Sequence, residues 1–425
     1  MYVASTRLFP TALLAVYLFM LSSCLKDKCT NNIPSKIYTP VYASLDSLRS
    51  SIRSESPHEI VSPGKIYLYG NYIFLNELNK GIHVIDNSNP SSPQKIAFIN
   101  IPGNVDLAVK GNVMYVDSYI DLVALDISDP HNIRQTKRLN NVFPQRQYEY
   151  GIIADTLRGI ITSFEIRDTV LSNTCNLASW NGVYVYNSAA NSVTVSNSSN
   201  VSVPSATGKA GSTARFGLMN NTLYTVDYYG IQVFNVQQAN EPVKKNNFTV
   251  FANIETIFPY DHYIFIGSTT GMLIYDVSNP EMPVAAGTFS HIQSCDPVVV
   301  EGKTAYVTLR SGTTCAGNQN QLDVINIADV KNPQLLKSYV MTGPYGLGID
   351  GNNLFVCEGT NGLHFMDATD PLNVETKQTV KDIEAYDVIP NNHVLLVTAK
   401  DGLYQYDYSN LSKPTLLSKI GIVIK

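Results

Sequence analysis

The chain is poor in charge and in cysteine for its length of 425 residues. Charged residues make up 15% of the sequence, the net charge is −5, and lysine and arginine are scattered along the chain rather than clustered. Binding of nucleic acid requires a basic patch or stripe. We therefore expect no nucleic-acid partner.

Signatures of catalysis and of metal binding are missing as well. The seven histidines form no His-Glu-x-x-His pair, and the chain has neither a Gly-x-Ser-x-Gly elbow nor a Cys-x-x-Cys pair. These absences exclude the commonest zinc hydrolases and serine hydrolases. The sequence predicts no metal and no cofactor.

A repeat dominates what the sequence does contain. Seven times an apolar run ends on Asp or Asn and is followed by a turn, often spelled Ser-Asn-Pro, and four of the six intervals are 40 or 41 residues. Such a side chain can hydrogen-bond its own backbone into a turn, and proline prevents the strand from continuing. The Asp or Asn stands at the sixth position of each copy, at Asp86, Asp126, Asn235, Asp276, Asn326, Asp367 and Asp407.

The length of the repeat predicts the fold. Between the motif copies lie pairs of apolar runs joined by turn residues, as in Asn253–Gly267, and one more short strand follows each copy. One period then holds four antiparallel strands in about forty residues, which is the size of a propeller blade. We predict an all-β, seven-bladed β-propeller of four-stranded antiparallel blades.

One interval is too long for this scheme. The copies that begin at Asp121 and Gly230 are 109 residues apart, and the excess falls at about residues 144–212, a stretch whose later part is rich in Ser, Asn, Ala and Gly. We interpret this stretch as an insertion into the propeller. Residues 180–187 also resemble a decayed copy of the motif, which leaves eight blades as an alternative.

The N-terminus predicts export and a lipid anchor. An apolar run from Leu8 to Leu21 precedes Ser22-Ser23-Cys24, a sequence that resembles the lipobox of bacterial lipoproteins. We therefore expect residues 1–23 to be a signal peptide, Cys24 to carry the lipid, residues 24–62 to be a tether and residues 63–425 to be the propeller. Ser44–Ser54 could form a short helix. The expected location is the bacterial cell envelope, on the periplasmic or the surface face of the outer membrane.

The remaining cysteines are few. Cys295 and Cys315 flank two predicted strands of one hairpin and are candidates for a disulfide, with two free thiols as the alternative. Cys357 lies in an alternating apolar run and is expected in the core.

The repeated segments GIHVIDNSNP, DLVALDISDP, GMLIYDVSNP and GLHFMDATDP resemble LVIVD repeats, a blade motif of secreted and cell-surface proteins. The resemblance covers roughly Lys65 to Lys419, apart from the insertion, and the third and fifth copies lack the Ser-Asn-Pro turn. It implies a β-propeller and implies no particular reaction.

Propeller geometry predicts where a site would lie. The loops that leave the second strands converge with the loops that lead into the first strands on one face of the central channel. The channel candidates on these loops are Asp117, Asp227, Tyr228, Arg215, Arg310, Glu358 and Asp296.

Two functions follow from this site. The first is a non-enzymatic binding or assembly scaffold for a glycan, a peptide or an envelope protein. The alternative is a hydrolase or lyase of polysaccharide or peptidoglycan that uses Asp117, Asp227 and Glu358, provided that two carboxyl groups lie about 5–10 Å apart.

Overall fold

The computed structural model describes residues 32–144, 158–172, 184–187, 209–227, 230–250, 253–290, 297–311 and 319–423. The chain forms two compact units. The larger unit is made of Ala43–Ile160 and Val193–Lys425, and the smaller of Met1–Tyr42 and Ile161–Ser192. Each unit is described by itself.

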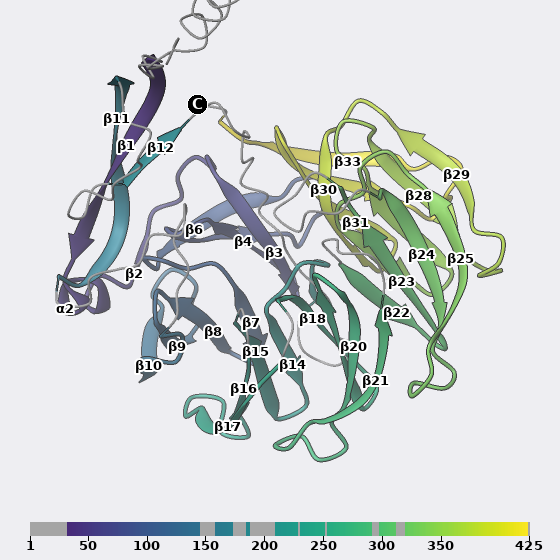
Figure 1. The fold of residues 1–425 in the computed structure, drawn as a ribbon, viewed down its shortest axis with the longest axis horizontal. Helices are drawn as coiled ribbons and strands as arrows, with labels where there is room; N and C mark the ends of the chain where they lie inside the picture. Colours follow the sequence, from purple (N-terminus) through teal and green to yellow (C-terminus); the bar gives the residue numbers. More distant parts are fainter. Residues whose placement is uncertain are drawn as a thin grey trace, which may run out of the picture. The chain divides into compact units, whose positions relative to one another are not determined.

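The larger unit is a seven-bladed β-propeller, as predicted. Seven four-stranded antiparallel sheets follow one another around a ring, from purple at the first blade to yellow at the last (Figure 1). Blade 1 consists of β3 (Pro63–Tyr69), β4 (Tyr72–Glu77), β5 (Gly81–Asp86) and β6 (Gln94–Asn100); blade 2 of β7 (Leu107–Lys110), β8 (Val113–Ser118), β9 (Asp121–Asp126) and β10 (Arg134–Leu139); blade 3 of β14 (Phe216–Met219), β15 (Thr222–Val226), β16 (Gly230–Asn235) and β17 (Val243–Thr249).

The other four blades repeat the order. Blade 4 consists of β18 (Ile254–Tyr260), β19 (Tyr263–Ser268), β20 (Gly271–Asp276) and β21 (Val284–Ser290); blade 5 of β22 (Val298–Glu301), β23 (Thr304–Leu309), β24 (Gln321–Asn326) and β25 (Gln334–Val340); blade 6 of β26 (Leu347–Asp350), β27 (Asn353–Cys357), β28 (Leu363–Asp367) and β29 (Glu375–Val380); blade 7 of β30 (Ala385–Asn391), β31 (Val394–Ala399), β32 (Gly402–Asp407) and β33 (Thr415–Gly421).

The repeated motif forms the third strand of every blade and the turn after it. In all seven copies the side chain of the sixth residue accepts a hydrogen bond from the backbone N–H two residues later. The N–H of Ser278 donates to Asp276 at 2.7 Å, and the N–H of Ala328 donates to Asn326 at 2.9 Å. The pairing of the third and fourth strands also shifts register in every blade. The predicted turn geometry is confirmed.

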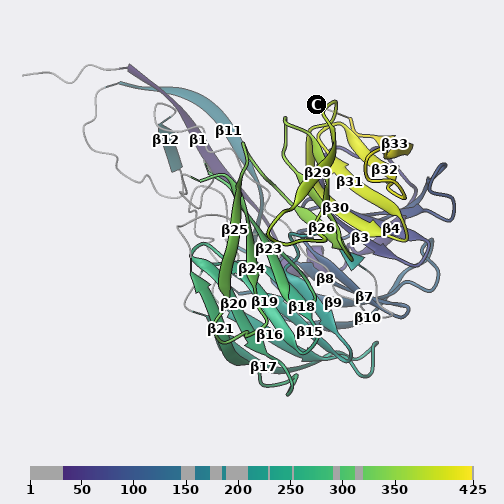
Figure 2. The same ribbon diagram turned by 90° about the vertical axis from the view of Figure 1, so that its right-hand side faces the viewer.

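The core lies within and between the blades. The first strands of successive blades contact one another from β3 around to β30, so they are the innermost strands of the ring. Every residue of β8 is buried, whereas β17 is almost entirely exposed. Figure 2 shows β17 at the outer edge of the ring. Cys357 is buried in the core, as predicted.

The ring closes between blades 1 and 7 by hydrogen bonds and side-chain packing. Each of these blades is built from consecutive strands of the chain. The backbone N–H of Val423 donates to the carbonyl of Ile60 at 2.8 Å, and Leu396 of blade 7 packs in one cluster with Ile73 of blade 1. Because no strand is exchanged between these two blades, hydrogen bonds and packed side chains together hold the ring closed at this seam.

Short elements extend blade 1 at both of its edges. β2 (Arg53–Glu55) pairs with the outer edge of β6, and β13 (Lys209–Ala210) pairs with the inner edge of β3. The helix α2 (Leu45–Arg49) begins after the N-cap Ser44 and occupies the first part of the predicted helical segment. It is the one helix of the described residues, and no helix there is long enough to span a membrane.

The smaller unit is a three-stranded sheet in the order β11 (Ile160–Ser172), β1 (Asn32–Ala43), β12 (Tyr184–Asn187). Tyr38 of β1 pairs with Tyr184, and Lys36 pairs with Tyr186. Residues 184–187 therefore pair with the N-terminal strand and do not begin a blade. The alternative of eight blades is wrong.

Candidate functional site

Three carboxylates at one end of the second strands hold the loops that lead into the first strands. Asp117 accepts hydrogen bonds from the backbone N–H groups of Val105 and Asp106 at 2.8 and 2.9 Å. Glu77 does the same with Val61 and Ser62, and Glu358 with Thr342 and Gly343. The same device thus shapes the loops of blades 1, 2 and 6.

In two of these blades a histidine completes the arrangement. His364 Nε2 lies 2.6 Å from Glu358 Oε2, and His83 Nε2 lies 3.2 Å from Glu77 Oε2. Burial disfavours the ionised form of Glu358, but the hydrogen bonds from His364 and Thr342 outweigh it and lower the pKa of that carboxyl. In blade 1 burial is likewise outweighed by His83, Lys80 and the backbone donors, which lower the pKa of Glu77 to about 2.

For the histidine of blade 1, unlike the two glutamates, burial is not outweighed and sets the direction of the pKa shift. The His83 side chain is fully buried, and burial lowers its pKa in spite of Glu77, so the ring is neutral at pH 7. These Glu–His pairs are hydrogen-bonded supports of the loops. Asp117 and Glu358, two of the three carboxylates proposed for a hydrolase, therefore both accept hydrogen bonds from their own loops.

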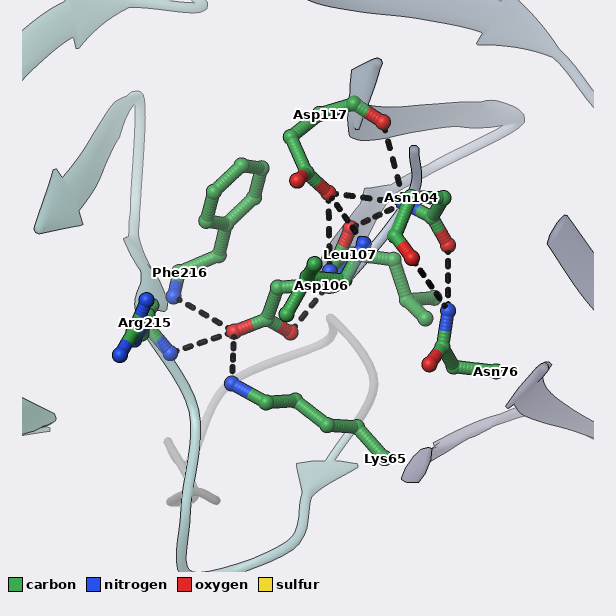
Figure 3. A network of polar contacts seen from close by, with 9 residues as sticks. Lys65, Asn76, Asn104, Asp106, Leu107, Asp117, Arg215 and Phe216 are labelled. Atoms are coloured by element: carbon green, nitrogen blue, oxygen red, sulfur yellow. Dashed lines mark hydrogen bonds and ion pairs between the residues drawn. The ribbon is translucent and has the colours of Figure 1, made fainter. Parts of the chain in front are cut away.

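A polar network joins blades 1, 2 and 3 near the axis (Figure 3). The Lys65 ammonium of β3 donates to Asp106 Oδ2 at 2.9 Å, and the same oxygen accepts the backbone N–H groups of Arg215 and Phe216. Burial lowers the pKa of Lys65, while the Coulomb attraction of Asp106 opposes this shift. Asp106 is therefore a buried connection between three blades.

The chain itself occupies the axis of the propeller. We call residues 209–215 the axis segment. The segment pairs with β3, and its Lys209 ammonium donates to the carbonyl of Pro390 in β30. Ser212 accepts from the N–H of Leu347 at 2.7 Å, and the carbonyl of Ala214 accepts from Ile257 at 3.0 Å. Together with Asp106, these contacts come from the innermost strands, or the loops leading into them, of blades 1, 2, 4, 6 and 7.

A second buried carboxylate fastens the axis segment. Asp387 Oδ1 accepts the N–H and the hydroxyl of Ser212 at 3.0 and 2.9 Å. Burial raises the pKa of Asp387 to about 7, although the bonds from Ser212 act in the other direction. The carboxylate also faces Gly211 and Gly346, where a Cβ atom would lie 2.0 and 2.3 Å from its oxygens. The site admits no side chain at these two positions.

Arg310 belongs to a different group on the loop face. Its guanidinium carbon lies 3.7 Å from the centre of the Tyr345 ring, and that ring lies 5.2 Å from the ring of Tyr386. Burial lowers the pKa of Arg310, against the attraction of the tyrosines and Glu255. Both tyrosine side chains remain partly exposed. We call Arg310, Tyr345 and Tyr386 the Arg–Tyr group.

The predicted site residues thus fall into separate places. Asp117 and Glu358 support loops, Arg215 ends the axis segment, Arg310 stacks on Tyr345, and Asp227 follows β15. The remaining predicted residues, Tyr228, Asp296, Cys24, Cys295 and Cys315, lie outside the described residues.

Two residues of these networks were not predicted. Lys65 and Asp387 each lie among apolar residues in the sequence, with no motif that marks them. Asp106 was expected near the channel, on a loop that leads into a first strand. The Glu–His pairs do leave one signal, because both blades have Glu six residues before His, as in Glu77 and His83. In the β-hairpin this spacing places the two side chains beside each other.

Comparisons with known proteins agree with the fold. The family model described as LVIVD repeat matches residues 63–97, 103–137 and 257–290. No curated protein matches the chain significantly.

Among solved structures, the Pseudomonas aeruginosa periplasmic gluconolactonase PpgL is similar with a TM-score of 0.52 at 12% identity, over 84% of this chain and 96% of that one. The computationally designed Ika8 protein is similar with a TM-score of 0.50 at 9% identity, over 86% of this chain and 90% of that one. At such identities the likeness shows the fold alone. The chain is a β-propeller that carries LVIVD repeats.

Proposed function

We propose that this chain is a lipid-anchored protein of the bacterial cell envelope whose propeller is a non-enzymatic binding or assembly module. The observation that carries the proposal is that carboxylates on the loop face accept hydrogen bonds within the fold. One oxygen of Asp117 accepts from the backbone of its own loop, as does one oxygen of Glu358, whose other oxygen lies 2.6 Å from His364 Nε2. Carboxylates held in this way are poorly suited to act as acid and base.

The Arg–Tyr group is the part of this face best suited to binding. Partly exposed tyrosine rings stack on sugars and apolar side chains, and a guanidinium donates to carboxylates and hydroxyls in fixed geometry. Glu384 accepts from the hydroxyl of Tyr386 and from Lys400, both at 2.7 Å, which holds the Tyr386 ring in place. A preordered group of this kind supports recognition of a glycan or peptide.

A binding array tests the proposal with the full-length chain. Glycan and peptide arrays are probed with the natural protein, with Arg310→Ala and with Arg134→Ala, a control arginine on the outer strand β10 whose side chain is 74% exposed. We expect a ligand whose binding falls at least tenfold in Arg310→Ala and is unchanged in Arg134→Ala. Release of fragments from polysaccharide or peptidoglycan would instead favour the hydrolase or lyase.

A further inference from the structure

We propose that the inner edge of β3, together with Asp106 and Asp387, is a binding site for an extended peptide of small, hydroxyl-bearing residues, which the axis segment fills in cis. The site is distinct from the Arg–Tyr group, and the inference does not depend on the proposed function. It concerns a strand edge inside the propeller that the chain covers with its own residues.

The axis segment binds in the way that an added strand binds a sheet. Lys209 and Ala210 pair antiparallel with Leu68 and Tyr67, and the N–H of Gly211 donates to the carbonyl of Ile66 at 3.3 Å. Peptides that add a strand to an exposed edge gain their affinity from such main-chain bonds. The edge of β3 therefore has a preformed pattern of donors and acceptors for an extended backbone.

The residues that line the site are more polar than packing of the axis segment alone requires. Lys65, Asp106 and Asp387 are each at most 5% exposed, and burying charged groups is unfavourable unless they are paired. The segment contributes no large apolar side chain between Ala210 and Ala214. Its backbone N–H groups and the Ser212 hydroxyl are what the two carboxylates bind.

Two details define the peptide that would fit. Gly211 lies against Asp387, so the peptide residue that precedes the serine must be glycine. Thr213 is 5% exposed, and its hydroxyl has no hydrogen-bond partner among the described residues. An unpartnered buried hydroxyl costs free energy, so the site does not require a hydroxyl at this position, and a ligand without one there would avoid this cost. The expected ligand is an extended sequence of the Ala-Gly-Ser type.

Hydrogen exchange of the natural full-length chain gives the first test. If the axis segment opens by itself, the amides of Ser212, Arg215 and Phe216 exchange at least tenfold faster than the amides of β3 that pair with β4. Exchange of both sets at one common rate, with global unfolding, would overturn the inference.

The second test supplies the peptide in trans. A fluorescent peptide with the sequence of residues 209–216 is titrated into the natural chain, into Gly211→Ala and into Gly343→Ala, a control glycine whose added Cβ would meet nothing within 4 Å. We expect binding to Gly211→Ala that is at least tenfold tighter than to the other two, and its loss when Asp387→Ala is added. A folded Gly211→Ala that does not bind the peptide, or binding that survives Asp387→Ala, would refute the site; should Gly211→Ala fail to fold, the exchange experiment decides.

Discussion

Ser212 donates two hydrogen bonds to the carboxylate of Asp387, which lies 175 residues later in the chain. The pair joins the segment that leads into blade 3 to the first strand of blade 7. Blades 1 and 7 meet without an exchanged strand, so a contact of this kind inside the ring adds to the connections that hold the last blade.

The stability of the propeller should depend on pH through Asp387. Its pKa is raised to about 7 in the folded chain, so the folded state holds a proton that the unfolded state has lost above about pH 4. The stabilisation from this proton is fully present below pH 4 and is lost as the pH rises to about 7. Over this range the equilibrium constant for folding falls by up to tenfold for each pH unit. Asp387→Asn should remove this slope in denaturant unfolding measured from pH 5 to 8.

The matched control for that experiment is Asp407→Asn. Hydrogen bonds from Ser409 lower the pKa of Asp407, so this carboxyl stays ionised in both states over the same range. Its replacement should leave the slope between pH 5 and 8 unchanged. Equal slopes in the natural chain and Asp387→Asn would contradict the assignment.

The turn after each motif strand should contribute to stability one copy at a time. Asp276→Ala removes the acceptor for the N–H of Ser278 at 2.7 Å, and a hydrogen bond of this kind contributes about 1 kcal/mol to folding. Asp276→Asn keeps an acceptor in place and should recover most of the loss. Chemical denaturation measures both variants, and equal losses in the two would contradict a role of the side-chain acceptor.

Glu358 should behave as a structural residue. Glu358→Ala leaves the N–H groups of Thr342 and Gly343 and the ring of His364 without their acceptor, which we expect to destabilise the chain by about 2 kcal/mol. Glu375→Ala, on the outer strand of the same blade and 52% exposed, is the control and should change stability by less than about 0.5 kcal/mol. Loss of a measurable catalytic activity at unchanged stability would favour the enzymatic alternative instead.

Lipidation of Cys24 predicts that the chain is found in the membrane fraction and that loss of this cysteine releases it. In a bacterial host the natural chain should fractionate with membranes, and Cys24→Ser should remove the acyl chains that anchor it. Mass spectrometry of the N-terminal peptide, with membrane fractionation, checks both points. A natural chain that remains in the aqueous fraction with an unmodified Cys24 would rule out the anchor.

The sequence predicted the features that depend on near neighbours. The seven copies of the motif, their turns and the hairpins between them rest on contacts between residues a few positions apart, such as Asp276 and Ser278. Such contacts recur once per blade, so they leave a period that can be counted. The fold class follows from that period, and the count of its copies favours seven blades.

The candidate sites depended on contacts that have no period. Ser212 meets Asp387 across 175 residues, Arg215 meets Asp106 across 109, and β12 pairs with β1 rather than with a blade. By itself the sequence determined a repeated four-stranded sheet and, from seven copies of the motif, favoured a ring of seven blades over the alternative of eight. Only the tertiary structure decided that the chain fills its own axis, because that depends on which distant polar groups the closed ring brings together, and burial then requires them to pair.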